Sequence, residues 1–210
     1  MKSISPREYL KKTLSEKDLE KSPHRQLEKW WQEAIAAEVD LLDAVFLSSV
    51  DHLGSPDARI VLLKSFDDEG LVFFTNYHSH KAIQLSQNPN ACMVIFWPEL
   101  ERQIRIRGPI KKTSRDESMA YFNSRPRGAQ LSAWASHQSQ SIKDRAHLEE
   151  LYDEISEKYS GKDVPCPDFW GGLRLIPEYF EFWQGRANRL HDRFAFNKAA
   201  NHWQAHRLAP

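Results

Sequence analysis

Cysteine is scarce in this sequence, and long apolar runs are absent. Only two cysteines occur among 210 residues, and Cys92 and Cys166 lie too far apart to match the spacing of a metal site. No apolar stretch is long enough to span a bilayer, and Met1 to Leu10 lack the apolar core of a signal peptide. These absences predict a cytoplasmic protein with reduced thiols and no bound metal.

An excess of charge of either sign is also absent. Lysine and arginine together number 29, as do aspartate and glutamate, so the formal net charge is zero. A neutral chain gains little long-range attraction to DNA or anionic lipid, which argues against a nucleic-acid or membrane partner. Local basic clusters can still bind a small anion. Seven tryptophans and eleven phenylalanines supply buried surface, and some could stack on a flat aromatic ligand.

The order of patterns along the chain predicts one mainly β domain. Residues 1–23 are polar and are expected to form a mobile N-terminal arm, and 24–210 a single domain that begins with a helix at 24–38. Short runs rich in Val, Ile, Phe and Thr predict strands at 44–51, 58–66, 71–76, 91–97, 102–112, 178–184, 189–196 and 203–208. Further helices are expected at 79–87, after a capping box at 114–117, and around 148–159. This arrangement is typical of an antiparallel barrel with peripheral helices.

The segment Arg59-Ile-Val-Leu-Leu-Lys64 combines an apolar strand with a cation at each end. It is apolar on both faces, which predicts a central strand buried on both sides, with Arg59 and Lys64 on opposite faces. Each cation needs an anionic partner, because an unpaired buried charge is very costly. Two ordinary salt bridges would satisfy this requirement, and the segment alone favours them over an anion site.

Two other segments could bind an anion. Ser79-His80-Lys81 stands where a strand meets a short helix, and a helix N-terminus beside a lysine is in principle a phosphate site. A plain serine cap with a solvated lysine is the commoner arrangement at such a place. Arg125-Pro-Arg127 leaves a helix through a stiff turn that fixes the direction of two guanidinium groups. Arginine forks match phosphate oxygens, and here the structural and functional interpretations are evenly balanced.

The segment Arg189-Leu-His191-Asp-Arg193 has the strongest pattern in the chain. If it is extended, Arg189, His191 and Arg193 share one strand face, and no acidic residue on that face offsets them. Crowded cations repel one another, so a bound anion is favoured over a solvated edge strand. Gln103 also lies on a polar strand face, but there the spacing gives no reason to single it out.

Several motifs together resemble those of the pyridoxine/pyridoxamine 5′-phosphate oxidases. Besides the two segments that begin at Arg59 and Arg189, they are Glu101-Arg-Gln, Ser124-Arg-Pro-Arg, Phe182-Trp-Gln-Gly and the terminal Arg207-Leu-Ala-Pro. Each motif is weak alone, but their order over nearly the whole chain is highly specific. The resemblance implies an FMN-binding split β-barrel that forms a homodimer, with two FMN molecules in clefts between the subunits.

The resemblance also implies which residues form the site. FMN would be contacted by Arg59, Ile60, Val61, Leu62, Leu63, Lys64, Phe74, Thr75, His80, Lys81, Gln103, Gln138, Ser139, Trp183 and Arg193. The substrate would be bound by Arg7, Tyr9, Lys64, Tyr121, Arg125, Arg189 and His191. Arg189 and His191 would lie over the substrate ring as the catalytic pair, and Arg7 to Tyr9 would belong to a mobile lid.

The implied reaction oxidises pyridoxine 5′-phosphate or pyridoxamine 5′-phosphate to pyridoxal 5′-phosphate. A hydride passes from substrate C4′ to flavin N5, and O2 then reoxidises the flavin to give H2O2. Three positions depart from the family's pattern. His80 stands in place of an Arg at the FMN phosphate, Ala129 in place of a Ser at the substrate phosphate, and Pro6 in place of an Arg of the lid.

Two alternatives stay open. One is a related split-barrel flavin oxidase of another pathway, such as the phenazine-type relatives. The other is a protein that binds FMN or pyridoxal 5′-phosphate without turnover. Tyr121, Arg125 and Arg127 favour the vitamin B6 enzyme, because a substrate without phosphate has no need of that cluster.

Overall fold

The computed structural model describes residues 8–200 and 202–210. Its α-helices are α1 (Pro23–Ala36), α2 (His80–Gln87), α3 (Arg115–Ser124), α4 (Arg127–Ala135) and α5 (Arg145–Lys158), with 3-10 turns at Glu16–Asp18 and Ala187–Arg189. Its strands are β1 (Ala44–Val50), β2 (Pro56–Leu62), β3 (Ser65–Asp67), β4 (Gly70–Asn76), β5 (Asn90–Trp97), β6 (Arg102–Lys112), β7 (Trp170–Leu175), β8 (Tyr179–Gln184), β9 (Asp192–Ala199) and β10 (His202–Leu208).

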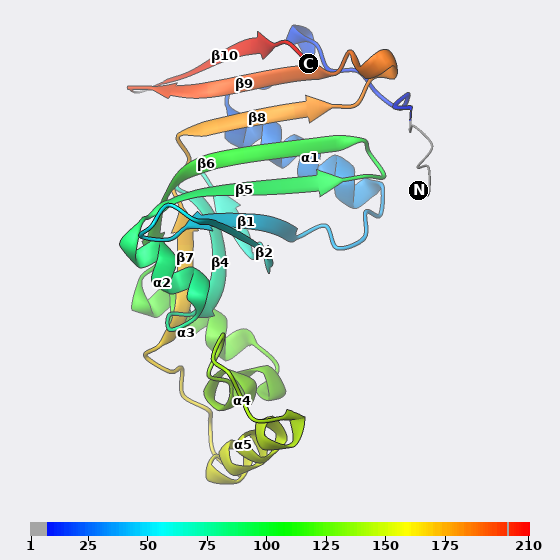
Figure 1. Cartoon of the computed structure of the whole chain (residues 1–210). Helices are drawn as coiled ribbons and strands as arrows, with labels where there is room; N and C mark the ends of the chain where they lie inside the picture. The colour runs from blue at the N-terminus through cyan, green and yellow to red at the C-terminus, as the bar shows by residue number, and fades with distance from the viewer. Residues whose placement is uncertain (1–7, 201) are drawn as a thin grey trace, which may run out of the picture.

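These strands form one sheet in which the described pairs are all antiparallel. The main path runs β10-β9-β8-β6-β5-β1-β2, and β7 and β4 branch from it with β3 beside β4 (Figure 1). The branch starts on β6, where Arg102 to Arg107 pair with β8 and Ile110 to Lys112 pair with β7. The sheet therefore curls without closing. The predicted mainly β antiparallel fold with peripheral helices is confirmed.

Helix α1 covers one face of the sheet (Figure 1). The Ser22 hydroxyl accepts a hydrogen bond from the backbone N–H of Arg25 and Pro23 occupies the first helical turn, which is a favourable start for a helix. Trp30 of α1 packs edge-on against Phe182 of β8, with ring centroids 5.2 Å apart. Alternation along β6 sends Ile104 and Ile106 to the same core, and both are fully buried. Gln103, Arg105 and Arg107, which alternate with them, therefore face the opposite side of the sheet, called the outer face below.

Helices α3, α4 and α5 form a separate group beyond the ends of β4 and β7 (Figure 1). Ser114 caps α3 by accepting from the backbone N–H of Glu117, as the capping signal predicts. A second apolar cluster holds these helices together around Phe122, Leu131 and Trp170. No helix of the described residues has the length and apolar character needed to cross a membrane.

Two strand predictions are wrong. The segment 58–66 is not one buried central strand. The strand is interrupted at Leu63 and Lys64, and β2 lies at the edge of the sheet. Ile60 of β2 is 58% exposed and Leu62 45%. The pattern was apolar on both faces because the outer face of β2 is itself apolar, and not because the chain covers it.

The segment 189–196 is extended only from Asp192 onward. Asn188 and Arg189 lie in a tight turn with φ of 56° and 61°, in the left-handed region that non-glycine residues seldom adopt. The alternation that placed Arg189 and His191 on a strand face therefore does not exist. One strand was also missed. The missed strand is β7, which begins Trp-Gly-Gly, and glycine weakens the β pattern. Glycine is required at position 171, because a Cβ there would lie only 2.2 Å from the Tyr77 hydroxyl.

The described part of the N-terminal arm contacts the sheet at several points. The backbone N–H of Lys11 donates to Glu101, and that of Leu14 donates to Asp192. Leu14 itself is 3% exposed within the main core. Arg7 and Pro6, both predicted to belong to a lid, lie outside the described residues. The division into an arm of 1–23 and a domain of 24–210 stays a prediction.

Candidate active site

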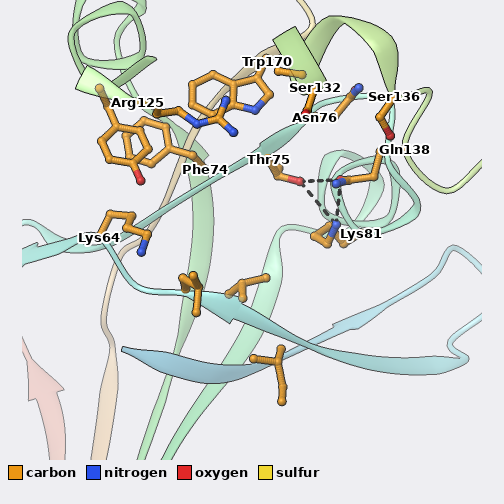
Figure 2. Close-up of a pocket in the computed structure, with 15 residues that line it drawn as sticks. Lys64, Phe74, Thr75, Asn76, Lys81, Arg125, Ser132, Ser136, Gln138 and Trp170 are labelled. Carbon is orange, nitrogen blue, oxygen red and sulfur yellow. Dashed lines mark hydrogen bonds between the residues drawn. The ribbon is translucent and has the colours of Figure 1, made fainter. Parts of the chain in front are cut away.

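A cavity of about 510 Å³ opens between β2, β4 and the helices α3 and α4. It brings together ten of the residues predicted to bind the cofactor or the substrate, namely Ile60, Val61, Leu62, Lys64, Phe74, Thr75, Lys81, Tyr121, Arg125 and Gln138. Figure 2 shows Arg125 and Lys81 on opposite sides of this cavity. The cavity therefore has two cationic ends, which differ in their surroundings.

At one end, the Lys81 ammonium lies among uncharged oxygens. Its Nζ is 3.1 Å from Gln138 Oε1 and 3.4 Å from Thr75 Oγ1, and the Thr75 hydroxyl donates to Gln138 Oε1 at 3.0 Å (Figure 2). Burial, and after it the neighbouring Arg59 guanidinium, lowers the pKa of Lys81. Among the described residues Lys81 has no salt bridge with a carboxylate. The Ser79 hydroxyl leaves the first turn of α2 uncapped, so free N–H groups and a cation meet here.

At the other end, the Arg125 guanidinium lies 4.7 Å from the centroid of the Trp170 ring. Its Nη1 is buried and has no hydrogen-bond partner among the described residues. Burial lowers the pKa of Arg125. The Phe74 ring stacks on Tyr121, with ring centroids 3.9 Å apart, and on Trp170, with centroids 5.4 Å apart. The three rings form an aromatic wall beside the guanidinium. A partly buried guanidinium whose buried N–H group has no partner among the described residues is suited to an anionic ligand.

The two cations of the Arg59 to Lys64 segment are already paired. Lys64 Nζ lies 2.7 Å from the Asp43 carboxylate. Arg59 pairs with Asp57 and donates to the Ser49 hydroxyl at 2.6 Å. The preference for two ordinary salt bridges is confirmed. Lys64 nevertheless lines the cavity, whereas Arg59 lies behind its wall near α2.

A second group of predicted residues lies far from this cavity, on the outer face of the sheet. Gln103 of β6, Trp183 of β8 and Arg193 of β9 are direct neighbours across three strands and form one cross-strand row. Four strand spacings separate β8 from β2 along the path of the sheet, or about 19 Å. Figure 1 shows the β8–β9 turn and helix α4 at opposite ends of the molecule. The predicted site residues of one chain therefore fall into two separate groups, called the two partial sites below.

His191 stands beside this row. Its ring lies 4.6 Å from Trp183 and 5.5 Å from Tyr9. The backbone N–H of Arg186 donates to His191 Nδ1 at 3.1 Å, so in the neutral ring the proton resides on Nε2. Burial, and then the charges of Arg189 and Arg193, lowers the pKa of His191 below the ordinary 6.5. At neutral pH the ring is an uncharged donor through Nε2.

Models of two protein families match this chain. "Pyridoxamine 5′-phosphate oxidase" matches residues 31–159, and "Pyridoxine 5′-phosphate oxidase C-terminal dimerisation region" matches residues 170–210. The chain belongs to the pyridoxamine 5′-phosphate oxidase family. The resemblance inferred from the sequence motifs is thereby confirmed.

Individual members of the family are similar over almost their whole length. A pyridoxine/pyridoxamine 5′-phosphate oxidase of Crocosphaera subtropica is 48% identical, covering 97% of this chain and 96% of its own. One of Paraburkholderia phytofirmans is 49% identical over 92% and 91%. The crystal structure of PhzG from Burkholderia lata, in complex with tetrahydrophenazine-1-carboxylic acid, has a TM-score of 0.87 at 29% identity over 92% and 95%. An FMN-binding protein of Nostoc punctiforme, at 19% identity over 90% and 98% with a TM-score of 0.72, shares the fold.

The cavity fits the FMN that oxidases of this family use. The uncapped N-terminus of α2, together with Lys81 and the hydroxyl of Thr75, offers donors for a phosphate group. The apolar side chains of β2 and the aromatic wall at Phe74 offer surface to a flat ring system. Lys81 lacks a carboxylate partner among the described residues, and a bound phosphate would supply the missing charge.

Some predicted residues lie away from both partial sites. Leu63 points into the core and is 4% exposed. His80 is exposed at the first residue of α2, and Ser139 is exposed in a turn with φ of 72°. Arg127, which was expected to share a phosphate cluster with Arg125, donates instead to the carbonyls of Tyr159 and Lys162 beyond the end of α5. That expectation is wrong, because the Pro126 turn directs the two guanidinium groups to different elements.

The sequence pattern also missed cavity residues. They are Asn76, Ser132, Ala133, Ser136 and Trp170. The stretch 132–139 looks like a polar loop, but α4 continues to Ala135 and places Ser132 and Ser136 one turn apart beside the cavity. Recognising the helix would have placed both serines on one face. Trp170 carries no local signal, since only the pairing of β7 with β4 brings it to Phe74.

Proposed function

We propose that this chain catalyses the FMN-dependent oxidation of pyridoxine 5′-phosphate or pyridoxamine 5′-phosphate by O2, giving pyridoxal 5′-phosphate and H2O2. With pyridoxamine 5′-phosphate, water enters and ammonia leaves as the amine carbon becomes an aldehyde. The observation that carries the proposal is the pair of cations, Lys81 and Arg125, that lie on opposite sides of one cavity and have no carboxylate partner among the described residues. The cofactor and the substrate each bring one phosphate, and the cavity offers one cationic end to each.

The cofactor end is assigned to Lys81, Thr75 and Gln138, whose polar atoms already form one network. When bound, FMN supplies the hydride acceptor and the reaction with O2. The protein contributes position and the exclusion of water. His80 stands beside Lys81 on the exposed side of α2, so we assign it at most a weak contact with the phosphate.

The substrate end is assigned to Arg125, with Tyr121 and Lys64 beside it. Nη1 of Arg125 has no hydrogen-bond partner among the described residues, whereas the Lys64 ammonium is already paired with Asp43 and would have to contact the substrate as well. The methyl side chain of Ala129 cannot donate a hydrogen bond, so the phosphate contact expected of a serine hydroxyl at this position is missing. We infer that Arg125 binds the substrate phosphate more strongly than either neighbour does.

The two partial sites are completed in a homodimer. Phe46, Ile60, Leu62 and Phe96 expose between 42% and 58% of their surface on the outer face, which is typical of an interface between subunits. We propose that each active site takes its cavity from one subunit and the row of Gln103, Trp183 and Arg193 from the other. His191 and Arg189 would then reach the substrate ring, with the Nε2–H of His191 as a neutral donor.

Oxygen uptake with pyridoxine 5′-phosphate tests the proposed reaction. The purified protein should be yellow and contain one FMN per chain, released into the supernatant by acid precipitation. Addition of pyridoxine 5′-phosphate should consume O2 and form pyridoxal 5′-phosphate in equal amounts. A yellow protein that turns over neither B6 phosphate would reduce the proposal to FMN binding alone. A colourless protein that takes up no added FMN would overturn both.

An oxidase of the phenazine type is the second candidate, because the PhzG structure is similar over nearly the whole chain. The substrate end distinguishes the two candidates. A tricyclic substrate with a carboxylate and no phosphate offers the Arg125 fork less negative charge and fewer acceptor oxygens than pyridoxine 5′-phosphate does. Turnover of a reduced phenazine carboxylic acid, combined with none of pyridoxine 5′-phosphate, would favour this second function.

Two sequence predictions remain proposals. The first is that residues 1–23 act as an arm whose start closes over the bound substrate. Tyr9 supports this because its ring contacts both Trp183 and His191. The second is a cytoplasmic location, which fits the free thiols of Cys92 and Cys166. Limited proteolysis with and without substrate tests the first, and cell fractionation tests the second.

A further inference from the structure

A buried carboxylate lies directly beside the cross-strand row. Glu181 of β8 is 2% exposed, although it belongs to the outer face with Trp183. Its Oε1 accepts a hydrogen bond from Arg193 Nε at 3.0 Å and forms an ion pair with Arg193 Nη2 at 2.9 Å. Its Oε2 accepts from Arg105 Nη1 at 3.1 Å and from the Tyr179 hydroxyl at 2.9 Å. The sequence pattern gave no acidic partner for Arg193, because this one lies on the neighbouring strand.

The other edge of the Arg193 guanidinium is held by the chain terminus. Arg193 Nη1 donates to the backbone carbonyl of Ala209 at 2.7 Å. A guanidinium has five N–H groups, and hydrogen bonds to Glu181 and Ala209 occupy two of them. The planar fork is therefore fixed in orientation and leaves N–H groups of Nη1 and Nη2 for a further partner.

The energetics favour orientation over stability as the result of this arrangement. Removing a carboxylate from water is costly, and a buried ion pair often stabilises a fold no more than apolar residues would. Two arginines face the single charge of Glu181, so the group keeps one net positive charge. Arg193 is thus both positioned and still able to attract an electron-rich ligand edge.

We propose that Glu181 and the Ala209 carbonyl are positioning groups that aim Arg193 at the flavin, without touching the flavin themselves. This inference rests on the proposed function, in which Arg193 contacts FMN. It assigns an indirect role in cofactor binding to the backbone carbonyl of Ala209. It also separates Arg193 from Lys81 and Arg125, which have no such partners among the described residues.

Two variants test the proposal. Glu181→Gln removes the charge, and deletion of Ala209 and Pro210 removes the carbonyl without altering the buried strand. Each should raise the dissociation constant of FMN roughly tenfold, measured by flavin fluorescence in titrations of the apoprotein. Glu178, three residues earlier in the chain, is exposed, so Glu178→Gln is the matched control and should leave the dissociation constant of FMN unchanged.

A double-mutant cycle separates positioning from a general structural role. If Glu181 acts through Arg193, then Glu181→Gln should have no further effect on FMN affinity in an Arg193→Ala background. An equal effect in both backgrounds would overturn the proposal. So would wild-type affinity in both the Glu181→Gln protein and the truncated protein. If Glu181→Gln fails to fold, the truncation paired with Arg193→Ala supplies the same cycle.

These outcomes are distinct from a failure of the proposed function. A wild-type protein that binds no FMN would refute the function before any variant is compared. A wild-type protein that binds FMN and oxidises pyridoxine 5′-phosphate, but whose affinity is insensitive to the two variants, would refute only the positioning of Arg193.

Discussion

The cations of the cavity and the cation of the outer-face row differ in whether the protein itself supplies a negatively charged partner. In the cavity, Lys81 and Arg125 are partly buried and have no carboxylate partner among the described residues. In the row, Arg193 is held by Glu181 and by the Ala209 carbonyl. A cation without a partner is suited to a ligand that brings a full negative charge, such as a phosphate. A cation that is already neutralised in part is suited to a ring edge, where orientation matters more than charge.

This difference predicts that loss of Arg189, beside the row, acts on the rate, whereas loss of a cation in the cavity acts on binding. Arg189→Ala should have the largest effect, because Arg189 is held in a strained turn beside His191. We expect the limiting rate of flavin reduction to fall on the order of 100-fold while FMN stays bound. Stopped-flow reduction at saturating pyridoxine 5′-phosphate measures it. An unchanged rate would remove Arg189 from the reacting centre.

Arg125→Ala should come next and should act chiefly through KM. Loss of a charge-assisted bond to a phosphate costs about 1.5–3 kcal/mol, or roughly 10–100-fold in KM for pyridoxine 5′-phosphate. Arg127→Ala is the matched control, because the Arg127 guanidinium donates to carbonyls just beyond the end of α5 and does not line the cavity. Steady-state kinetics with pyridoxine and its phosphate measure both variants. If Arg125→Ala weakens both substrates equally, Arg125 does not bind the phosphate.

Lys81→Met should raise the dissociation constant of FMN roughly tenfold, because it removes the charge at the uncapped N-terminus of α2. His80→Ala alters the adjacent, exposed residue on the same helical turn and should change the affinity by less than about threefold. Titration of the two apoproteins with FMN gives both values. A larger effect of His80 than of Lys81 would reverse the assignment of the phosphate donors.

The smallest effect is expected on the inner side of β8, behind the row. His24 packs against Phe180 and Trp203, and its Nε2 is buried without a hydrogen-bond partner among the described residues. Burial is the main cause that lowers the pKa of His24, Lys198 lowers it further, and Asp67 and Asp68 oppose the shift. The folded state thus binds fewer protons, so this contribution to stability is lost as the pH falls below about 6.5.

His24→Phe keeps the packing and removes the titration. The thermal midpoint of wild type should therefore fall more between about pH 7.5 and 5.5 than that of the variant. Parallel melts in matched buffers at both pH values measure the difference. Identical losses in the two proteins would show that His24 does not contribute to the pH dependence.

Sequence patterns located most elements, and they failed where pairing decides the outcome. The helical spacing of apolar residues in 24–38, the capping box at 114–117 and the alternation in β6 are local signals. They placed α1, α3 and β6 correctly. The edge position of β2 could not be read from the sequence, because an apolar outer face looks the same whether the next strand or another subunit covers it. The turn at Arg189 was missed because Leu190 and His191 continue an alternating pattern that the backbone does not follow.

The sequence by itself determined the family, the strand-rich fold and the residue types of the site, because these depend on local patterns and on the order of motifs. Only the tertiary structure decided which of those residues meet. Sheet register sets Gln103, Trp183 and Arg193 side by side and places Glu181 beside Arg193. The Pro126 turn separates Arg125 from Arg127. These contacts join elements as many as 90 residues apart in the chain, and no local propensity encodes such a pairing.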